Sequence, residues 1–153
     1  QFLAIINRKA EDEQAGARDP QINYFIACAC EALGKKHQSR QYFSKSANQQ
    51  VKEAGLSRYY QGLSLAKLGE KEKAIQLFQS LTDRGKNMLS QAGEPDFFAK
   101  FGERQTESVW RSNAYLFIGL GAKGTGDMAG ARENLTKAIP LSASNLWAAF
   151  EIK

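Results

Sequence analysis

Three glycines recur in this chain with the same companions at the same distances. A small residue lies seven positions before each glycine, a second lies five positions after it, and a bulky residue follows four positions later. The three sets are Ala27, Gly34, Ser39 and Phe43; Gly62, Gly69, Ala74 and Phe78; and Gly119, Gly126, Ala131 and Leu135. Repeats of about 20–50 residues mark supersecondary units that bury their apolar faces against their neighbours. We therefore expect stacked helical hairpins with a glycine at each turn.

The pattern places three repeats at about residues 20–54, 55–91 and 106–140 of a single 153-residue domain. In the first repeat, Pro20 suits the first turn of a helix, and a second helix is expected from about Gln38 to Ala54. In the second repeat, apolar residues at helical spacing favour a helix that runs past Asp83 toward Leu89.

The third glycine comes late in the chain, which indicates an insertion. Gly69 follows Gly34 by 35 positions, whereas Gly126 follows Gly69 by 57, so about residues 83–105 are inserted between the second and third repeats. We expect three phenylalanines of this insertion, Phe97, Phe98 and Phe101, to pack back on the hairpins as a lid. The alternative is an apolar cluster that faces a ligand or a partner.

The third repeat is expected to begin with a long amphipathic helix, and its second helix should run from about Met128 until Pro140 ends it. Ser144 or Asn145 could cap a last helix that begins near Leu146 and covers the end of the stack.

Charge and hydropathy narrow the class of protein. The net charge is +5 and the pI is about 9.3, but basic side chains are interspersed with acidic ones. Phosphate-binding proteins usually gather positive charge on one face, so we do not expect nucleic-acid binding. No run approaches the roughly 18 apolar residues of a spanning helix, and the first residues do not resemble a signal peptide. The chain begins at Gln1, so we expect a piece of a longer protein.

Residues that could support chemistry are few. Cys28 and Cys30 point to different faces of a helix and are expected to be packed thiols, and His37 is the single histidine. We therefore expect no catalytic residue, no metal and no cofactor.

The G-x-G-x-x-G of Gly119, Gly121 and Gly124 resembles a dinucleotide fingerprint. The apolar spacing before it is helical, however, and positions 137–144 lack the acidic residue that such a site needs. Gly119 and Gly126 occupy the same repeat positions as Gly62 and Gly69, so we expect Gly119 to serve helix packing.

The second repeat matches the pattern of a known family at Gly62, Gly69, Ala74 and Phe78, and the third matches it at Tyr115, Ile118, Gly119, Gly126 and Ala131. The chain thus resembles the tetratricopeptide repeat (TPR) family. Arg58 and Asn23 replace the aromatic residue that opens a repeat, and the closing proline is missing or displaced to Pro140. The resemblance implies an all-α, right-handed superhelical stack of about three hairpins with a C-terminal capping helix.

A narrower resemblance covers YYQGLSLAKLGEKEKAIQLFQSLTDRGK, DFFAKFGE and YLFIGLGAKGTGDMAGARENLTKAI. These segments look like the C-terminal repeat region of large bacterial proteins whose upstream domain is similar to galactose-mutarotase-like β-sandwiches. This resemblance implies that any carbohydrate-related chemistry belongs to the upstream domain.

The TPR resemblance also implies a concave face, built by the first helix of each hairpin, that binds peptides. The corresponding residues are Gln21, Tyr24, Cys28, Tyr59, Leu63, Leu116 and Leu120, with Glu31, Leu56, Ala66, Asn113 and Lys123 in neighbouring slots. The carboxylate clamp of chaperone-tail receptors is absent from these slots, so the face is expected to suit an apolar segment or a neighbouring domain.

Our leading hypothesis is a non-enzymatic, cytoplasmic module that binds a protein, a peptide or an upstream domain of the same chain. The alternatives are an accessory domain that contributes to the site of a carbohydrate-related enzyme and, third, a basic helical-repeat RNA binder. The open ends of such a stack would also allow a homodimer.

Overall fold

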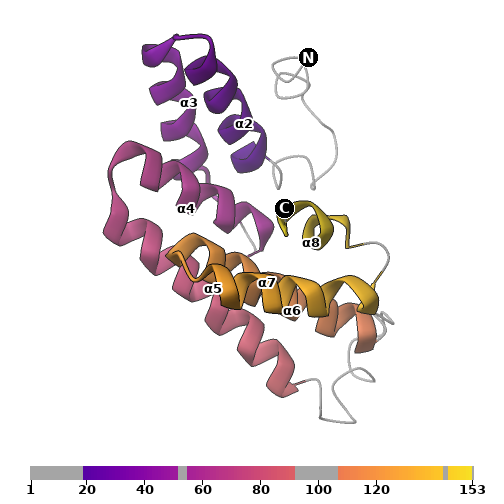
Figure 1. Ribbon diagram of the computed structural model, residues 1–153. Coiled ribbons are helices and arrows are strands. Elements are labelled where there is room, and N and C mark those ends of the chain that lie inside the picture. Colours follow the sequence, from indigo (N-terminus) through magenta and orange to yellow (C-terminus); the bar gives the residue numbers. More distant parts are fainter. Residues whose placement is uncertain (1–18, 52–54, 92–106, 143–144, 153) are drawn as a thin grey trace, which may run out of the picture. The chain divides into compact units, whose positions relative to one another are not determined.

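The computed structural model describes residues 19–51, 55–91, 107–142 and 145–152, and every regular element in these ranges is a helix (Figure 1). The elements are α2 (Asp19–Ala32), α3 (Lys36–Asn48), α4 (Leu56–Leu68), α5 (Lys71–Gln91), α6 (Glu107–Thr125), α7 (Met128–Ala138), the 3-10 helix η2 (Ile139–Leu141) and α8 (Leu146–Glu151). They fall in two compact units, Gln1–Leu77 and Phe78–Lys153, and α5 begins in the first and ends in the second. The predicted all-α fold of helical hairpins is confirmed, and the single domain stays a prediction.

The recurring glycines lie at the turns between paired helices. Gly34, Gly69 and Gly126 have φ angles of 72°, 92° and 90°. A side chain at such a φ would crowd the following carbonyl, which is why helices so often end on glycine. At the second turn, Gly69 N–H donates to Ala66 O and Glu70 N–H donates to Leu65 O, which satisfies carbonyls at the end of α4. The turn therefore requires glycine in each repeat.

The small and large residues of each repeat are buried. Ala27, Ala74 and Ala131 are at most 2% exposed, and so are Phe78 and Leu135. In the third hairpin, a Cβ built on Gly119 would lie 2.7 Å from Leu135 Cγ. The small residue thus makes room for the large one, because closely packed helices leave no gap for an added methyl group.

In the N-terminal unit, α2, α3 and α4 are all in contact with one another. Buried hydroxyls join them: Ser46 Oγ donates to Pro20 O and Ser64 Oγ donates to Ser46 Oγ, both at 2.7 Å. The prediction that the second helix runs to Ala54 is wrong, because α3 ends at Asn48 and Gln49 is extended. The side-chain amide of Gln61 donates to Gln49 O at 2.6 Å, which holds the chain outside the helix.

In the C-terminal unit, α6 packs closely on the second part of α5. A Cβ on Gly85 would lie 2.5 Å from Ala114 O, and Trp110 Nε1 donates to Met88 O at 2.7 Å. The helix α5 continues to Gln91, as expected, so residues 83–91 of the predicted insertion are helical. The predicted lid of Phe97, Phe98 and Phe101 lies outside the described residues.

The last helix predicted near Leu146 is present as α8, and it contacts α6 and α7. Asn145 precedes it, but its side chain makes no cap hydrogen bond. Its amide instead donates to Ser112 Oγ at 3.0 Å, so Asn145 ties the start of α8 to α6. Ser144, the other predicted cap, lies outside the described residues.

Candidate functional site

One strip of side chains in the N-terminal unit is partly exposed on the first helices of two successive repeats. We define this α2–α4 face by Tyr24, Cys28 and Glu31 of α2 and by Leu63 and Lys67 of α4. Residues three or four apart share one side of a helix, so each helix contributes one line of side chains. Tyr24, Cys28 and Leu63 are half-buried, which leaves part of each available to a partner.

An ion pair joins the two helices at one end of this face. Lys67 Nζ lies 2.7 Å from Glu31 Oε2, and the two side chains are 43% and 50% exposed. The hydrogen bond with Glu31 raises the pKa of Lys67 and outweighs the opposite effect of burial. The Lys67 ammonium also lies 5.9 Å from the centroid of the Phe43 ring. The pair therefore neutralises its own charges and leaves the centre of the face apolar.

An aromatic cluster holds Tyr24 in place. The Tyr24 ring centroid lies 5.4 Å from that of Tyr60 and 5.8 Å from that of Phe43, and Tyr59 lies 5.4 Å from Tyr60. These rings come from α2, α3 and α4 and meet at tilted or edge-on angles that aromatic pairs favour. Tyr24 is thus a rigid part of the face.

The structure places four of the seven predicted concave residues in the cores of their units. Gln21 and Tyr59 are 7% and 3% exposed in the N-terminal unit, and Leu116 and Leu120 are 4% and 0% exposed in the C-terminal unit. A helix that packs against several others buries some of the residues that the repeat pattern assigns to its exposed side. The predicted surface is therefore reduced to Tyr24, Cys28 and Leu63.

Glu31 was among the residues predicted for the concave face, but its partner Lys67 was not. The prediction placed the adjacent residue, Ala66, on that face instead. The signal was present: Glu31 lies three positions before Gly34, and Lys67 lies two positions before Gly69. Opposite charges near the ends of two successive first helices are placed to pair when those helices lie side by side.

A hollow of about 330 Å³ lies in the C-terminal unit. Its described lining comes from α6, α7, α8 and the residue after α8: Lys123, Met128, Ala131, Arg132, Leu135, Glu151 and Ile152. Lys123 Nζ donates to Glu151 Oε2 at 2.9 Å and to Glu151 O at 2.6 Å. The ammonium of Lys123 therefore holds the last turn of α8.

Groups suited to metal binding or redox chemistry do not converge in the ranges that the structure describes. No three His, Cys, Asp or Glu side chains there come together, and Cys28 and Cys30 are both free and half-buried. The side-chain amide nitrogen of Gln41 lies 3.1 Å from His37 Nε2.

The G-x-G-x-x-G glycines all lie within α6. A Cβ on Gly121 would lie 2.5 Å from Phe78 O, and one on Gly124 would lie 2.3 Å from the Phe78 ring. These glycines let α6 approach α5 within the C-terminal unit. A nucleotide fingerprint would need a strand before its first glycine, whereas Gly119 lies within α6 against Leu135, so its interpretation as a helix-packing residue is confirmed.

Among the described residues, no helix is both long enough and apolar enough to cross a membrane.

The sequence of the first hairpin matches a known repeat family. Residues 20–48, which comprise α2 and α3 almost completely, match the tetratricopeptide repeat family. The first hairpin is similar to a TPR. The turns at Gly69 and Gly126 have the same left-handed glycine and the same pattern of closing hydrogen bonds as the turn at Gly34.

Two solved structures are similar to the chain. One is MamA, residues 41 to the end, from Desulfovibrio magneticus RS-1, with 16% identity, a TM-score of 0.27, and coverage of 88% of this chain and 81% of that one. The other is the MamA RS-1 ArsTM double mutant, with 15% identity, the same TM-score and the same coverage. No curated protein matches the chain in sequence.

Proposed function

We propose that this chain is a non-catalytic, TPR-like interaction module that binds an apolar protein segment on the α2–α4 face. The observation that carries this proposal is the line of Tyr24, Cys28 and Leu63, which are half-buried on the first helices of two successive repeats. A rigid aromatic ring provides contact area with little loss of side-chain entropy, which suits it to anchor a partner.

The test uses peptides selected from a displayed random library on the immobilised chain. Leu63→Ala should weaken the selected peptides about tenfold, because truncation of a central apolar contact typically costs more than about 1 kcal/mol. The matched control is Leu33→Ala, since Leu33 is 70% exposed and lies beyond the end of α2. Equal binding to both variants, with unchanged thermal unfolding, would reject the α2–α4 face as the binding surface.

The partner is, in our proposal, a domain of the same protein, as the resemblance to bacterial proteins with a mutarotase-like upstream domain implies. Co-purification of this chain with the domain encoded upstream of Gln1 in the native gene tests it. If the two do not co-purify, the partner is a separate protein. The alternative to this proposal is an accessory domain that contributes to a carbohydrate-related active site. Activity, oligomeric state and the expected cytoplasmic location are each measured on the full-length protein.

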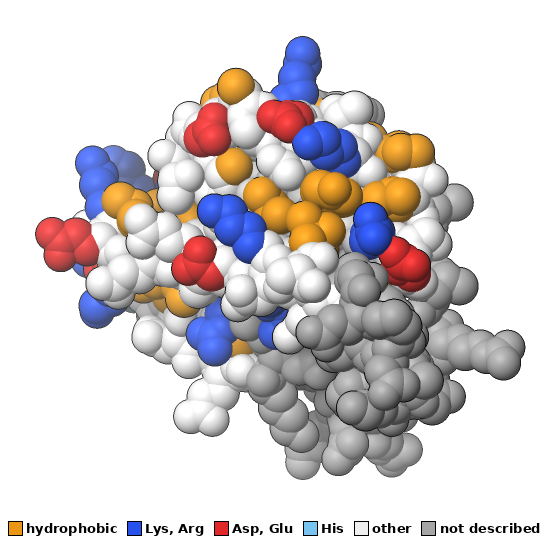
Figure 2. Space-filling view, turned by 90° about the horizontal axis from the view of Figure 1, so that it is seen from below, with side chains coloured by type: hydrophobic (Ala, Val, Ile, Leu, Met, Phe, Trp, Pro, Cys, Tyr) orange, Lys and Arg blue, Asp and Glu red, His pale blue; other side chains and the backbone are white. Residues whose placement is uncertain are grey.

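Charge pairing argues against RNA as the partner. Lysines and arginines are paired with nearby carboxylates in Lys67–Glu31, Lys73–Glu70, Arg111–Glu107, Lys123–Glu151 and Lys137–Glu133. On the face drawn in Figure 2, basic and acidic side chains stand close together among hydrophobic ones. Local pairing lowers the potential available to a phosphate backbone.

A further inference from the structure

The exposed side of α3 is basic, and none of its charges is acidic. The helix contains Lys36, Arg40 and Lys45 and no acidic residue, and Lys35 directly precedes it. None of these four cations forms an ion pair with another described residue, whereas five other cations do. Lys45 Nζ instead lies 4.7 Å from the centroid of the Tyr42 ring.

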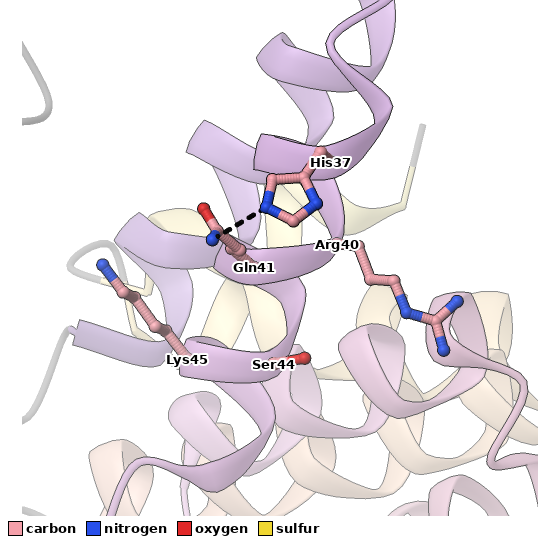
Figure 3. A pocket seen from close by; sticks show the side chains of 5 residues that line it. All are labelled: His37, Arg40, Gln41, Ser44 and Lys45. Atoms are coloured by element: carbon pink, nitrogen blue, oxygen red, sulfur yellow. Dashed lines mark hydrogen bonds between the residues drawn. The ribbon is translucent and has the colours of Figure 1, made fainter.

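An open hollow of about 450 Å³ lies along this side of the helix. Its described lining is His37, Arg40, Gln41, Ser44 and Lys45, all from α3. Figure 3 shows His37, Gln41 and Lys45 in one line along the helix and Arg40 and Ser44 in another. We call these five residues and Lys36 the basic α3 face.

The basic α3 face is separate from the α2–α4 face. The buried side chains of α3 are Ser39, Phe43 and Ser46. At about 100° per residue, they lie on the opposite side of the helix from Gln41 and Ser44, and Arg40 lies about 90° from their centre. A ligand on the basic face would therefore leave the α2–α4 face free.

The spacing of these groups fits a carboxylate-bearing chain. Lys36, Arg40 and Ser44 follow one another at four-residue intervals, which corresponds to about 6 Å along a helix. Alternate residues of an extended peptide are about 6.6 Å apart on one side of that peptide. Carboxylates at alternate positions can therefore meet successive cations and hydroxyls, and an arginine guanidinium can bind a carboxylate through two hydrogen bonds.

We propose that the basic α3 face binds an extended acidic segment of a partner protein. Charge complementarity selects this occupant: the face offers unpaired cations and polar donors, namely the amide of Gln41 and the hydroxyl of Ser44, over about two helical turns. Single-stranded nucleic acid binds best where aromatic rings are exposed for base stacking, and His37 is the one ring among the five residues of the hollow. The short row of cations also suits a few carboxylates better than a long phosphate backbone.

The test is a titration of the chain, at low salt, with a fluorescein-labelled peptide in which glutamate alternates with serine, followed by fluorescence anisotropy. We expect this peptide to bind at least about tenfold more tightly than the same peptide with glutamine in place of glutamate. Arg40→Glu combined with Lys45→Glu should weaken binding by about the same factor, since each substitution replaces attraction with repulsion.

The matched control is Lys71→Glu combined with Lys86→Glu, which changes the net charge by the same amount at two exposed lysines outside α3. This control should retain most of the peptide binding. Leu63→Ala, which alters the α2–α4 face, should retain all of it. The binding of acidic peptides to α3 can therefore be disproved while the proposed function of the α2–α4 face stands. An equal loss in both charge-reversed variants would show that net charge alone attracts the peptide and would overturn the proposal.

Two other outcomes would also overturn it. One is tighter binding of a labelled oligouridylate than of the glutamate peptide, which would make the face a nucleic-acid site. The other is a severalfold gain in peptide binding when Glu11, Asp12 and Glu13 are changed to glutamine, which would make the chain's own acidic run the occupant. Circular dichroism of each variant verifies that the helices are retained.

Discussion

Ser112 Oγ, in the first helix of the third hairpin, donates a 2.7 Å hydrogen bond to the backbone carbonyl oxygen of Ala138, in the second helix. The first hairpin has the same bond between the same two repeat positions, with the donor on the opposite helix: Ser46 Oγ donates to Pro20 O, also at 2.7 Å. In each hairpin one partner lies fourteen positions before the turn glycine and the other lies twelve positions after it. The open ends of the first and third hairpins are thus each closed by a buried serine.

Substitution of Ser112 by alanine should destabilise the protein. The change leaves Ala138 O buried without its donor and removes the acceptor of Asn145, so we expect a loss of about 1–3 kcal/mol in the free energy of unfolding. Urea denaturation measures it, and Ser46→Ala should behave alike. Thr136→Ala, at an exposed position of α7, is the control, and a similar loss there would contradict a specific role for the bond.

The contact between Gly119 and Leu135 should show strong energetic coupling. Gly119→Ala alone forces a methyl group against Leu135, which should cost about 1–3 kcal/mol. Leu135→Ala alone opens a cavity and should cost about 2–5 kcal/mol. In the double variant the added methyl occupies part of the cavity, so its loss of stability should be smaller than the sum. Strict additivity in a double-mutant cycle would mean that the two residues do not share this space.

The ion pair on the α2–α4 face should give the protein a dependence of stability on alkaline pH. The folded-state pKa of Lys67 is raised above its ordinary value of 10.5 by the hydrogen bond with Glu31. Protonated Lys67 therefore favours the folded state below about pH 10.5, and this contribution is lost as the pH rises through the higher folded-state pKa. Lys67→Gln should have a flatter profile of unfolding free energy above pH 10 than the parent chain. The control is Lys71→Gln, which alters an exposed lysine and should keep the pH profile of the parent chain. If the parent chain and both variants have identical profiles, the ion pair has no role in this pH dependence.

The pair between Lys123 and Glu151 should hold α8 in place. Glu151 is 8% exposed and Lys123 is 26% exposed, so Lys123→Met leaves a carboxylate largely buried without its cation. We expect a loss of about 1–3 kcal/mol and a red shift of Trp147 emission, measured in a Trp110→Phe background, as α8 separates. Lys137→Met removes the exposed pair with Glu133 and should change neither stability nor emission appreciably.

Features that depend on neighbours in the sequence could be predicted well. The turn at Gly126 depends on backbone conformation, and the pairing of Gly119 with Leu135 depends on helix geometry within one hairpin, so both could be inferred from spacing alone. The same logic assigned Gly119 to helix packing, whereas the contacts of Gly121 and Gly124 with Phe78 emerged only from the structure. The end of α3 could not be inferred, because it depends on the side chain of Gln61, a residue of the next helix.

The sequence by itself determined the hairpins of this protein, since the conformation of a glycine turn and the spacing of small and large residues are set over a few helical turns. Tertiary structure alone decided which side chains of the first helices stay at the surface. Tyr59 and Leu120 are buried because their helices pack on several others, whereas Tyr24 and Leu63 remain partly exposed in similar slots. That outcome depends on contacts between residues far apart in the chain, and the pairing of Glu31 with Lys67 across 36 positions depends on the same contacts.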